Sequence, residues 1–207
     1  MKTLLKNLAF AVLPALSLLF MFSGPVYAAD EVRDITGKTP SEIGGGISIL
    51  SPGDTVTFIG SNVLPTDEYL AFTIPAGVTL VWQAHLSGSF SGLSTALVSF
   101  VGLGNFRVAG GSIVVTSGYS HAITKNNDGL LEITGGSVTA NEPGNFALRL
   151  LTGTTIIVGG SVSAPMSAVR VEGQSHFAYL EGIVDPTKVS AGVNSVHFRI
   201  DTLAIPV

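Results

Sequence analysis

The chain contains no cysteine among its 207 residues, which excludes a disulfide framework. Charged residues are also scarce, at 12% of the sequence, and they form no basic cluster. After the first 28 residues, no window shows a long 3.6-residue apolar period, which excludes a helical repeat. The fold must therefore be stabilised by apolar burial and by backbone hydrogen bonds between short extended segments.

Residues 1–28 are typical of a signal peptide. Lys2 and Lys6 form a basic start, residues 8–22 carry no charge, Pro25 interrupts the apolar run, and residues 26–28 place small side chains where a signal peptidase cleaves. The apolar run of about 15 residues is shorter than the roughly 20 needed to span a bilayer, which disfavours an uncleaved anchoring helix. We expect cleavage after Ala28, no later membrane span, and a protein that is secreted or held at the cell surface.

The net charge disfavours two classes of partner. Cleavage would remove Lys2 and Lys6, leaving 8 Lys and Arg against 14 Asp and Glu, a formal net charge of −6 on residues 29–207. Binding to nucleic acid depends on neutralising phosphates, and binding to anionic lipid depends on basic clusters. We therefore expect neither nucleic acid nor an anionic membrane surface as a partner.

Two landmarks recur with one period. The triplet Gly-Gly-Ser begins at residues 110, 135 and 159, at spacings of 25 and 24, and a weaker copy begins at Gly182. A small residue followed by an apolar one recurs out of phase with it, at Ala96-Leu97, Ala122-Ile123, Ala147-Leu148, Ala168-Val169 and the degenerate Ser195-Val196. Such a period is the signature of a repeat architecture.

Each unit contains three short segments that are rich in Val, Ile and Thr and separated by turn residues, for example residues 131–134, 137–140 and 146–150. Three strands of about four residues per unit, stacked about 4.8 Å apart, predict an all-β fold: a right-handed parallel β-helix, or β-solenoid, with rungs of about 24 residues. The handedness rests on the general preference of parallel crossovers. An antiparallel sandwich is the alternative, but it does not explain the fixed period.

Alternation of apolar residues predicts which side chains point inward. Before each Gly-Gly pair we expect one inward column, and after it a second. The first consists of Val108, Ile133, Ile157 and Leu180; the second consists of Ile113, Val138 and Val162. Ala140 and Ala164 would point inward at a tight corner, where each Gly pair permits a bend that a Cβ would obstruct.

The units define the expected domain organisation. Residues 29–52 concentrate charge and are predicted to form an N-terminal cap over the first rung, whose open ladder would otherwise recruit other chains. Residues 53–207 would form the solenoid, with its clearest rungs at 105–200 and irregular early strands near 55–59, 69–74 and 78–82. The C-terminal residues 197–207 would form a cap or an edge used for self-association through terminal rungs.

The Gly-Gly-Ser units give the chain a resemblance to known proteins. It resembles the secreted right-handed β-helix proteins grouped as pectin-lyase-like, and more closely the repeat regions of bacterial surface and adhesin-like proteins with Gly-Gly-Ser/Thr-Val units. The resemblance covers residues 106–184 well and the rest loosely. It implies an extended extracellular scaffold that often meets polysaccharide, and it assigns no catalytic residue.

One outward column is the candidate binding site. Thr124, Arg149, Arg170 and His197 follow the second landmark on successive rungs, so two guanidinium groups would stand one rung apart. Like charges that close repel, and an anionic partner such as a sulfated or uronic-acid-containing glycan would bridge them. Alternatively, nearby acids such as Glu172 neutralise them, or the side chains splay into water.

Exposed rings would give a second surface for sugars. Trp82, Tyr119 and Tyr179 are the candidates, and Tyr179 is placed in an outward column after Ile156. The three lie at different corners, which favours core or corner-filling roles.

Catalytic and metal chemistry has little support. The carboxylates of the clear rungs fall in different columns, whereas polysaccharide lyases and hydrolases need acids gathered on one face. The four histidines are far apart in the predicted register, so we expect no metal site and no cofactor. An enzymatic alternative would rely on Asp54, Asp67 and Glu68 in the early rungs.

The sequence thus favours an exported, non-enzymatic surface or extracellular binding and adhesion module, with polysaccharide or a cell-surface glycan as its ligand class. Two alternatives remain open: a diverged carbohydrate-active enzyme of the lyase or hydrolase type, and a self-assembling structural surface protein.

Overall fold

The computed structural model describes residues 28–180, 183–192 and 196–200. Within these ranges the elements are β1 (Asp30–Asp34), α2 (Pro40–Gly44), η1 (Ile47–Ile49), β2 (Thr55–Ile59), β3 (Ser61–Val63), β4 (Leu70–Ile74), β5 (Thr79–Trp82), β6 (His85–Gly102), β7 (Asn105–Val108), β8 (Ser112–Asn127), β9 (Leu130–Ile133), β10 (Ser137–Ala140), β11 (Leu148–Ile157), β12 (Ser161–Ser163), β13 (Val169–Leu180), η2 (Pro186–Lys188), β14 (Val189–Ala191) and β15 (Val196–Ile200).

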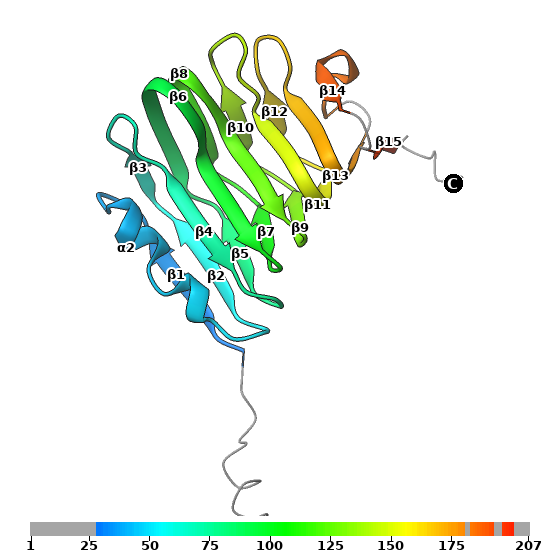
Figure 1. Ribbon diagram of the computed structural model, residues 1–207. Coiled ribbons are helices and arrows are strands. Elements are labelled where there is room, and N and C mark those ends of the chain that lie inside the picture. The colour runs from blue at the N-terminus through cyan, green and yellow to red at the C-terminus, as the bar shows by residue number, and fades with distance from the viewer. Residues whose placement is uncertain (1–27, 181–182, 193–195, 201–207) are drawn as a thin grey trace, which may run out of the picture.

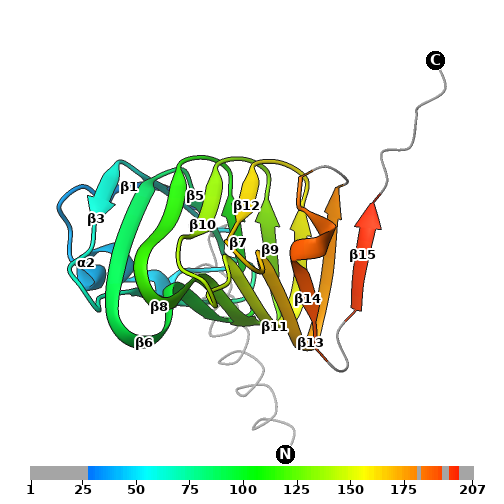
Figure 2. The ribbon, with the colours of Figure 1, turned by 90° about the horizontal axis from the view of Figure 1, so that it is seen from above.

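The strands wind into a parallel β-solenoid of about six turns (Figures 1 and 2). Every strand pair in the described part of the chain is parallel, so the antiparallel sandwich is wrong. Each turn contributes to three faces. Face 1 contains β1, β2, β5, β7, β9, residues 154–157, residues 176–180 and β15. Face 2 contains β3, the first part of β6 and of β8, β10 and β12. Face 3 contains β4, residues 98–102, residues 123–127, residues 148–150, residues 169–171 and β14.

The Gly-Gly-Ser landmark has the predicted register. Ser137 pairs with Ser112 and with Ser161, so the three copies stack on adjacent turns of face 2. The second glycine of the pair has a positive φ in each copy, +70° at Gly136, and a Cβ there would overlap the carbonyl oxygen of Gly110 in the turn before. The pair therefore allows a left-handed bend under close backbone stacking, as expected.

The second landmark is confirmed only in the middle of the molecule. Ile123, Leu148 and Val169 stack on one another. The prediction is wrong by one residue at Leu97, because irregular pairing along β6 places Val98 beside Ile123. It is also wrong at Val196, which pairs with His176 on face 1, whereas Val189 lies beside Val169.

The predicted inward columns form the core. Val108, Ile133 and Ile157 stack and are fully buried, as predicted. Ile113, Val138 and Val162 form the second stacked and buried column, also as predicted. Ala140 and Ala164 are buried as well. Leu180 is the exception: Tyr179 pairs with Ile157 and is buried in its place. This turn is 22 residues long, counted from Ile157 to Tyr179, so a 23-residue extrapolation selects the wrong neighbour.

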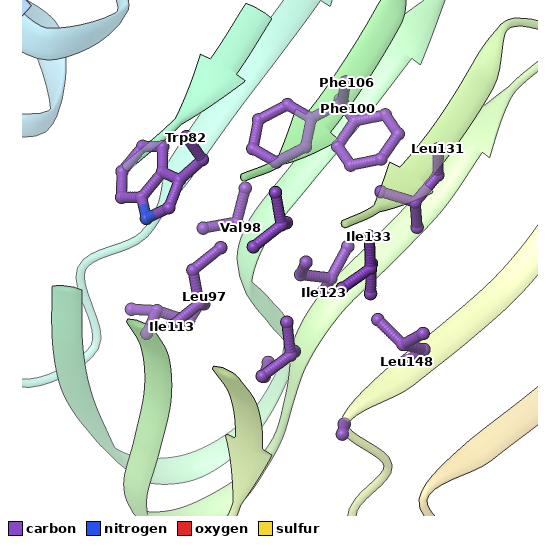
Figure 3. Packing of buried hydrophobic residues seen from close by; sticks show 14 of the residues in the cluster. Trp82, Leu97, Val98, Phe100, Phe106, Ile113, Ile123, Leu131, Ile133 and Leu148 are labelled. Atoms are coloured by element: carbon purple, nitrogen blue, oxygen red, sulfur yellow. The ribbon is translucent and has the colours of Figure 1, made fainter. Parts of the chain in front are cut away.

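The early turns carry a cluster of aromatic rings. Strands β2, β4 and β5 coincide closely with the three predicted early strands. Phe58, Phe72, Trp82, Phe100 and Phe106 lie with neighbouring ring centroids 4.9–6.2 Å apart. Figure 3 shows Trp82, Phe100 and Phe106 among the other buried side chains. All five are buried, so rings fill much of this part of the interior, together with aliphatic side chains such as Leu80 and Val98.

The N-terminal end is covered unevenly. Helix α2 begins at a capping box, in which Glu42 accepts from the Thr39 backbone N–H at 2.8 Å, and it packs against β4. Beside β3, the Asn62 side chain donates to the Lys38 carbonyl at 2.7 Å. The first turn of faces 2 and 3 thus has neighbours outside the stack. The outer edge of β1 has no strand partner among the described residues.

None of the described helical segments has the length and apolar character needed to cross a membrane.

Candidate functional site

Face 3 carries a polar outward column across five consecutive turns. Its members are Ser99, Thr124, Arg149, Arg170 and Ser190, each paired with the next in the strand register. The predicted stacking of Thr124, Arg149 and Arg170 is confirmed, but Thr124 is only 7% exposed and offers little surface to a ligand. The placement of His197 is wrong, because His197 pairs with Phe177 on face 1 and Ser190 takes the position beside Arg170. After β13 the chain forms β14 on face 3 and then β15 on face 1. The extrapolated period assigned β15 to face 3 because it did not include β14.

Glu172 bridges the two arginines. Arg170 Nε donates to Glu172 Oε1 at 2.7 Å, and Arg149 Nε donates to Glu172 Oε2 at 3.1 Å. The carboxylate lies two residues beyond Arg170 on the same outward side of β13, which places it between guanidiniums of adjacent turns. The alternative in which Glu172 neutralises the pair is therefore the arrangement present. The three groups together carry a formal charge of +1.

An aromatic ring lies against this cluster. The Arg170 guanidinium carbon is 5.5 Å from the centroid of the Phe146 ring, within the range of a cation–π contact. The His121 ring also contacts Phe146, with the two ring centroids 5.0 Å apart. Arg149, Arg170, Glu172, Phe146 and His121 are defined here as the arginine face.

His121 is neutral at physiological pH. Burial, together with the positive charge of Arg149 and Arg170, lowers the pKa of His121 from 6.5 to about 4, and Glu172 opposes this only in part. The backbone N–H of Phe146 donates to His121 Nδ1 at 3.2 Å, which assigns the ring proton to Nε2. The arginine face therefore offers guanidinium donors, one imidazole N–H and one ring face.

Of the three candidate aromatics, one is available to a ligand. Trp82 and Tyr179 are buried, which confirms a core role for both and corrects the outward placement of Tyr179. Tyr119 is 62% exposed and precedes His121 by two residues on β8. It lines a hollow of about 440 Å³ with Gly118, Glu142 and Pro143.

Two of the three acids proposed for catalysis, Asp54 and Asp67, hold turns instead. Asp54 accepts from the backbone N–H groups of Ala29 and Ser51, each at 2.8 Å. Asp67 accepts from the Ser91 backbone N–H at 2.8 Å and from its hydroxyl at 2.5 Å. These hydrogen bonds lower the pKa of both carboxyls, so each favours the ionised acceptor form over a general acid. Among residues 28–180, 183–192 and 196–200 no group of three or more His, Cys, Asp or Glu is placed to hold a metal ion.

The sequence reasoning missed a lysine inside the solenoid. Lys125 occupies an inward column between Phe100 and Leu150 and has no exposed surface. Its Nζ donates to the carbonyl oxygens of Asn127 at 2.6 Å and Thr152 at 2.7 Å, linking two turns. Alternation from the inward Ile123 was the signal, because it places Lys125 on the inward side. The side chain is inaccessible to a ligand, and its role is to stabilise the scaffold.

No protein-family model, curated protein or solved structure matches this chain. The β-solenoid scaffold is therefore established by the strand register alone.

Proposed function

We propose that the protein is an exported, non-enzymatic binding module of the cell surface or extracellular space, and that its arginine face binds an anionic polysaccharide. The observation that carries the proposal is the pair Arg149 and Arg170, held on adjacent turns with a shared carboxylate and a ring beside them. The resemblance of the Gly-Gly-Ser units to adhesin-like surface proteins is consistent with this role.

The geometry suits an extended polymer. The column from Ser99 to Ser190 runs across successive turns, perpendicular to the strands, so a chain lying along it would meet the guanidinium pair and, on one side, the partly exposed Ser190. A guanidinium has five N–H donors, and the contacts with Glu172 engage only part of each fork. A uronate carboxylate or a sulfate would accept from the remaining donors, and the exposed Tyr119 ring would give a stacking surface nearby.

The test is retention on a panel of immobilised neutral, uronic-acid-containing and sulfated polysaccharides, with the supernatant assayed for released sugar. Arg149→Ala combined with Arg170→Ala should abolish retention on the anionic matrices. Arg107→Ala is the matched control, because Arg107 on face 1 is also exposed and also paired with a glutamate, Glu132, at 2.5 Å. Glu172→Gln should strengthen retention by freeing both guanidiniums.

Three outcomes discriminate between the functions. Retention that survives the double substitution would contradict the proposed site. Absence of retention on every matrix would contradict the polysaccharide proposal. Sugar release by the wild-type protein would favour the carbohydrate-active enzyme, whose acids would then have to lie elsewhere than the turn-holding Asp54 and Asp67.

A second candidate function, self-assembly, is favoured by the open edge of β1. Residue Ala29 accepts from Thr55 N–H and Ile35 donates to Ile59 O, so the intervening Asp30, Val32 and Asp34 direct their backbone groups away from β2. A groove of about 460 Å³ lies between this edge and the residues around α2. Val32 is 65% exposed there, although the other faces of the first turn are covered.

The strand that fits this edge is β15 of a second copy. Strands β1 and β15 are the first and last described strands of face 1, they run in the same direction, and each has five residues (Figure 2). Continuing the register would place acidic β1 beside β15, which contains His197 and Arg199. Such a head-to-tail contact does not close and would build a linear filament.

Light scattering against protein concentration tests assembly. Val32→Pro removes an outward N–H that β2 does not use, so it should keep the monomer folded and abolish association. The Arg149→Ala/Arg170→Ala variant should associate like wild type. A mass that stays monomeric at all concentrations contradicts the candidate.

A further inference from the structure

Asp54 is a nearly buried carboxylate without a Lys, Arg or His partner among the described residues. It is only 7% exposed, in the turn that leads into β2. The register places it between Ala29 of the turn before and the fully buried Val78 of the turn after. A buried ionised carboxylate normally requires a positive partner or a full set of hydrogen bonds, and here both oxygens accept only backbone N–H groups.

One of those donors is the nitrogen at the expected cleavage point. Ala29 N lies 2.8 Å from Asp54 Oδ1, and Ala29 O accepts from Thr55 N–H at 2.9 Å. Ala29 is thereby held at both its nitrogen and its carbonyl group. Ala28 and Ala29 are both exposed, so neither side chain is part of the core.

We propose that Asp54 is the receptor for the N-terminal ammonium group created when the chain is cleaved between Ala28 and Ala29. Hydrolysis of that peptide bond adds one water, leaves a carboxylate on Ala28, and converts the Ala29 N–H into an ammonium group. The nitrogen that now contacts Asp54 as a neutral donor becomes a charged one at the same place. The inference depends on the signal-peptide prediction and is independent of the polysaccharide proposal.

The consequence is that maturation completes the first turn. Asp54 already accepts this hydrogen bond as a carboxylate, and an ammonium donor adds the attraction between two opposite charges. The pair would fix the start of β1, whose outer edge has no strand partner in the described part of the molecule. Export and final stability are then coupled through one side chain.

The pair also predicts a pH dependence with a defined sign. An α-amino group has an ordinary pKa of about 7.7–8.0, and contact with Asp54 raises it in the folded state. Because the folded pKa lies above the unfolded one, the added stability is fully present below about pH 7.7 and is lost as the pH rises through the raised pKa.

The experiment begins with the full precursor expressed in a bacterial host and recovered from the exported fraction. Intact mass should give a chain that starts at Ala29. The α-amino group is then titrated by NMR after ¹³C-reductive dimethylation, and a pKa above 8 is expected. In Asp54→Asn the pKa should return to its ordinary range, whereas Asp185→Asn, which removes an exposed turn carboxylate elsewhere, should leave it raised.

A second comparison does not depend on the stability of the Asp54 variant. A chain that retains Ala28 moves the ammonium group one residue away, and it should unfold about 4 °C below the mature chain at pH 7. At pH 10 that difference should disappear. A mature N-terminus other than Ala29, an α-amino pKa of 8 or below, or equal melting temperatures of the two chains at pH 7 would each overturn the proposal.

Discussion

The early and the middle turns of the solenoid share one register but fill their interiors differently. Trp82 and Val108 occupy consecutive positions of the same inward column that Ile133 and Ile157 continue. This column holds the rings of Phe58 and Trp82 in the early turns and aliphatic side chains in the middle turns, and it ends with the Tyr179 ring, which stacks on Phe177. A sequence period is visible only where successive turns use similar side chains, although the backbone repeats throughout.

Lys125 lies where the two regions meet. Its inward column reads Phe72, Phe100, Lys125, Leu150 and Val171. The lysine therefore replaces an apolar side chain at the border between rings and aliphatic residues. Its Nζ donates hydrogen bonds to the carbonyl oxygens of Asn127 and Thr152, which offset part of the cost of burying the amine.

The largest effect is expected from breaking the ring cluster. Trp82→Ala should lower the free energy of unfolding by about 4 kcal/mol, because a large cavity would form, whereas Ile133→Val in the aliphatic region should cost about 1 kcal/mol. Trp82 Nε1 has no hydrogen-bond partner among the described residues. Trp82→Phe should therefore cost far less than Trp82→Ala. Urea unfolding measures all three, and equal losses for Trp82→Ala and Ile133→Val would contradict the comparison.

The border lysine should make stability rise at alkaline pH. Burial lowers the pKa of Lys125 from 10.5 to about 8, and Asp128 opposes the shift. Between these values the unfolded state binds more protons than the folded state, so the unfolding free energy increases with pH, by about 3 kcal/mol in total.

Lys125→Met is the control for this prediction. Other groups titrate in the same window, so the quantity to measure is the difference between wild type and variant in urea unfolding at pH 7.5, 9 and 10.5. That difference should shift in favour of wild type as the pH rises. A difference that is constant with pH would show that the lysine is not buried as a charged group.

What the sequence could predict follows from the same comparison. The Gly-Gly-Ser stacking and the columns through Ile133 and Val138 were predictable. Backbone crowding at Gly136 requires glycine and the inward columns use similar apolar side chains, so the same residue types recur at a regular spacing in the sequence. Leu180 was misplaced because its turn is shorter than the earlier ones, and His197 was misplaced because the chain forms β14 before β15. Extrapolation at a fixed period does not detect either change in length.

The candidate site was predictable in part for the same reason. Arg149 and Arg170 directly follow the landmarks Ala147-Leu148 and Ala168-Val169, so their adjacency was predicted from the landmark although that turn is short. The contact of Phe146 with Arg170 depends on a corner, where alternation no longer indicates direction. Lys125 was missed although alternation places it inward, because a lysine is expected at the surface.

Two glycines with positive φ should distinguish the stability cost of steric crowding from the cost of backbone strain. Gly136 has φ +70° and its Cβ would overlap Gly110 O, whereas Gly144 has φ +89° with no atom within 4 Å of a Cβ. Gly136→Ala should therefore lower the unfolding free energy by about 2 kcal/mol or more, and Gly144→Ala by about 1 kcal/mol from backbone strain alone. Equal losses in thermal unfolding would indicate that stacking at the Gly-Gly pair is looser than the register implies.

The smallest effect is expected from His121, at the edge of the arginine face. Its folded pKa of about 4 lies below its ordinary 6.5, so the unfolded state takes up a proton first as the pH falls. Unfolding free energy should decline between pH 6.5 and 4, by about 1 kcal/mol after allowance for partial exposure of the ring. Protonation also removes the acceptor that Nδ1 offers to the Phe146 N–H, which loosens the ring beside Arg170. His121→Gln should flatten this part of the stability profile, and an unchanged profile would place the acid sensitivity in the carboxylates instead.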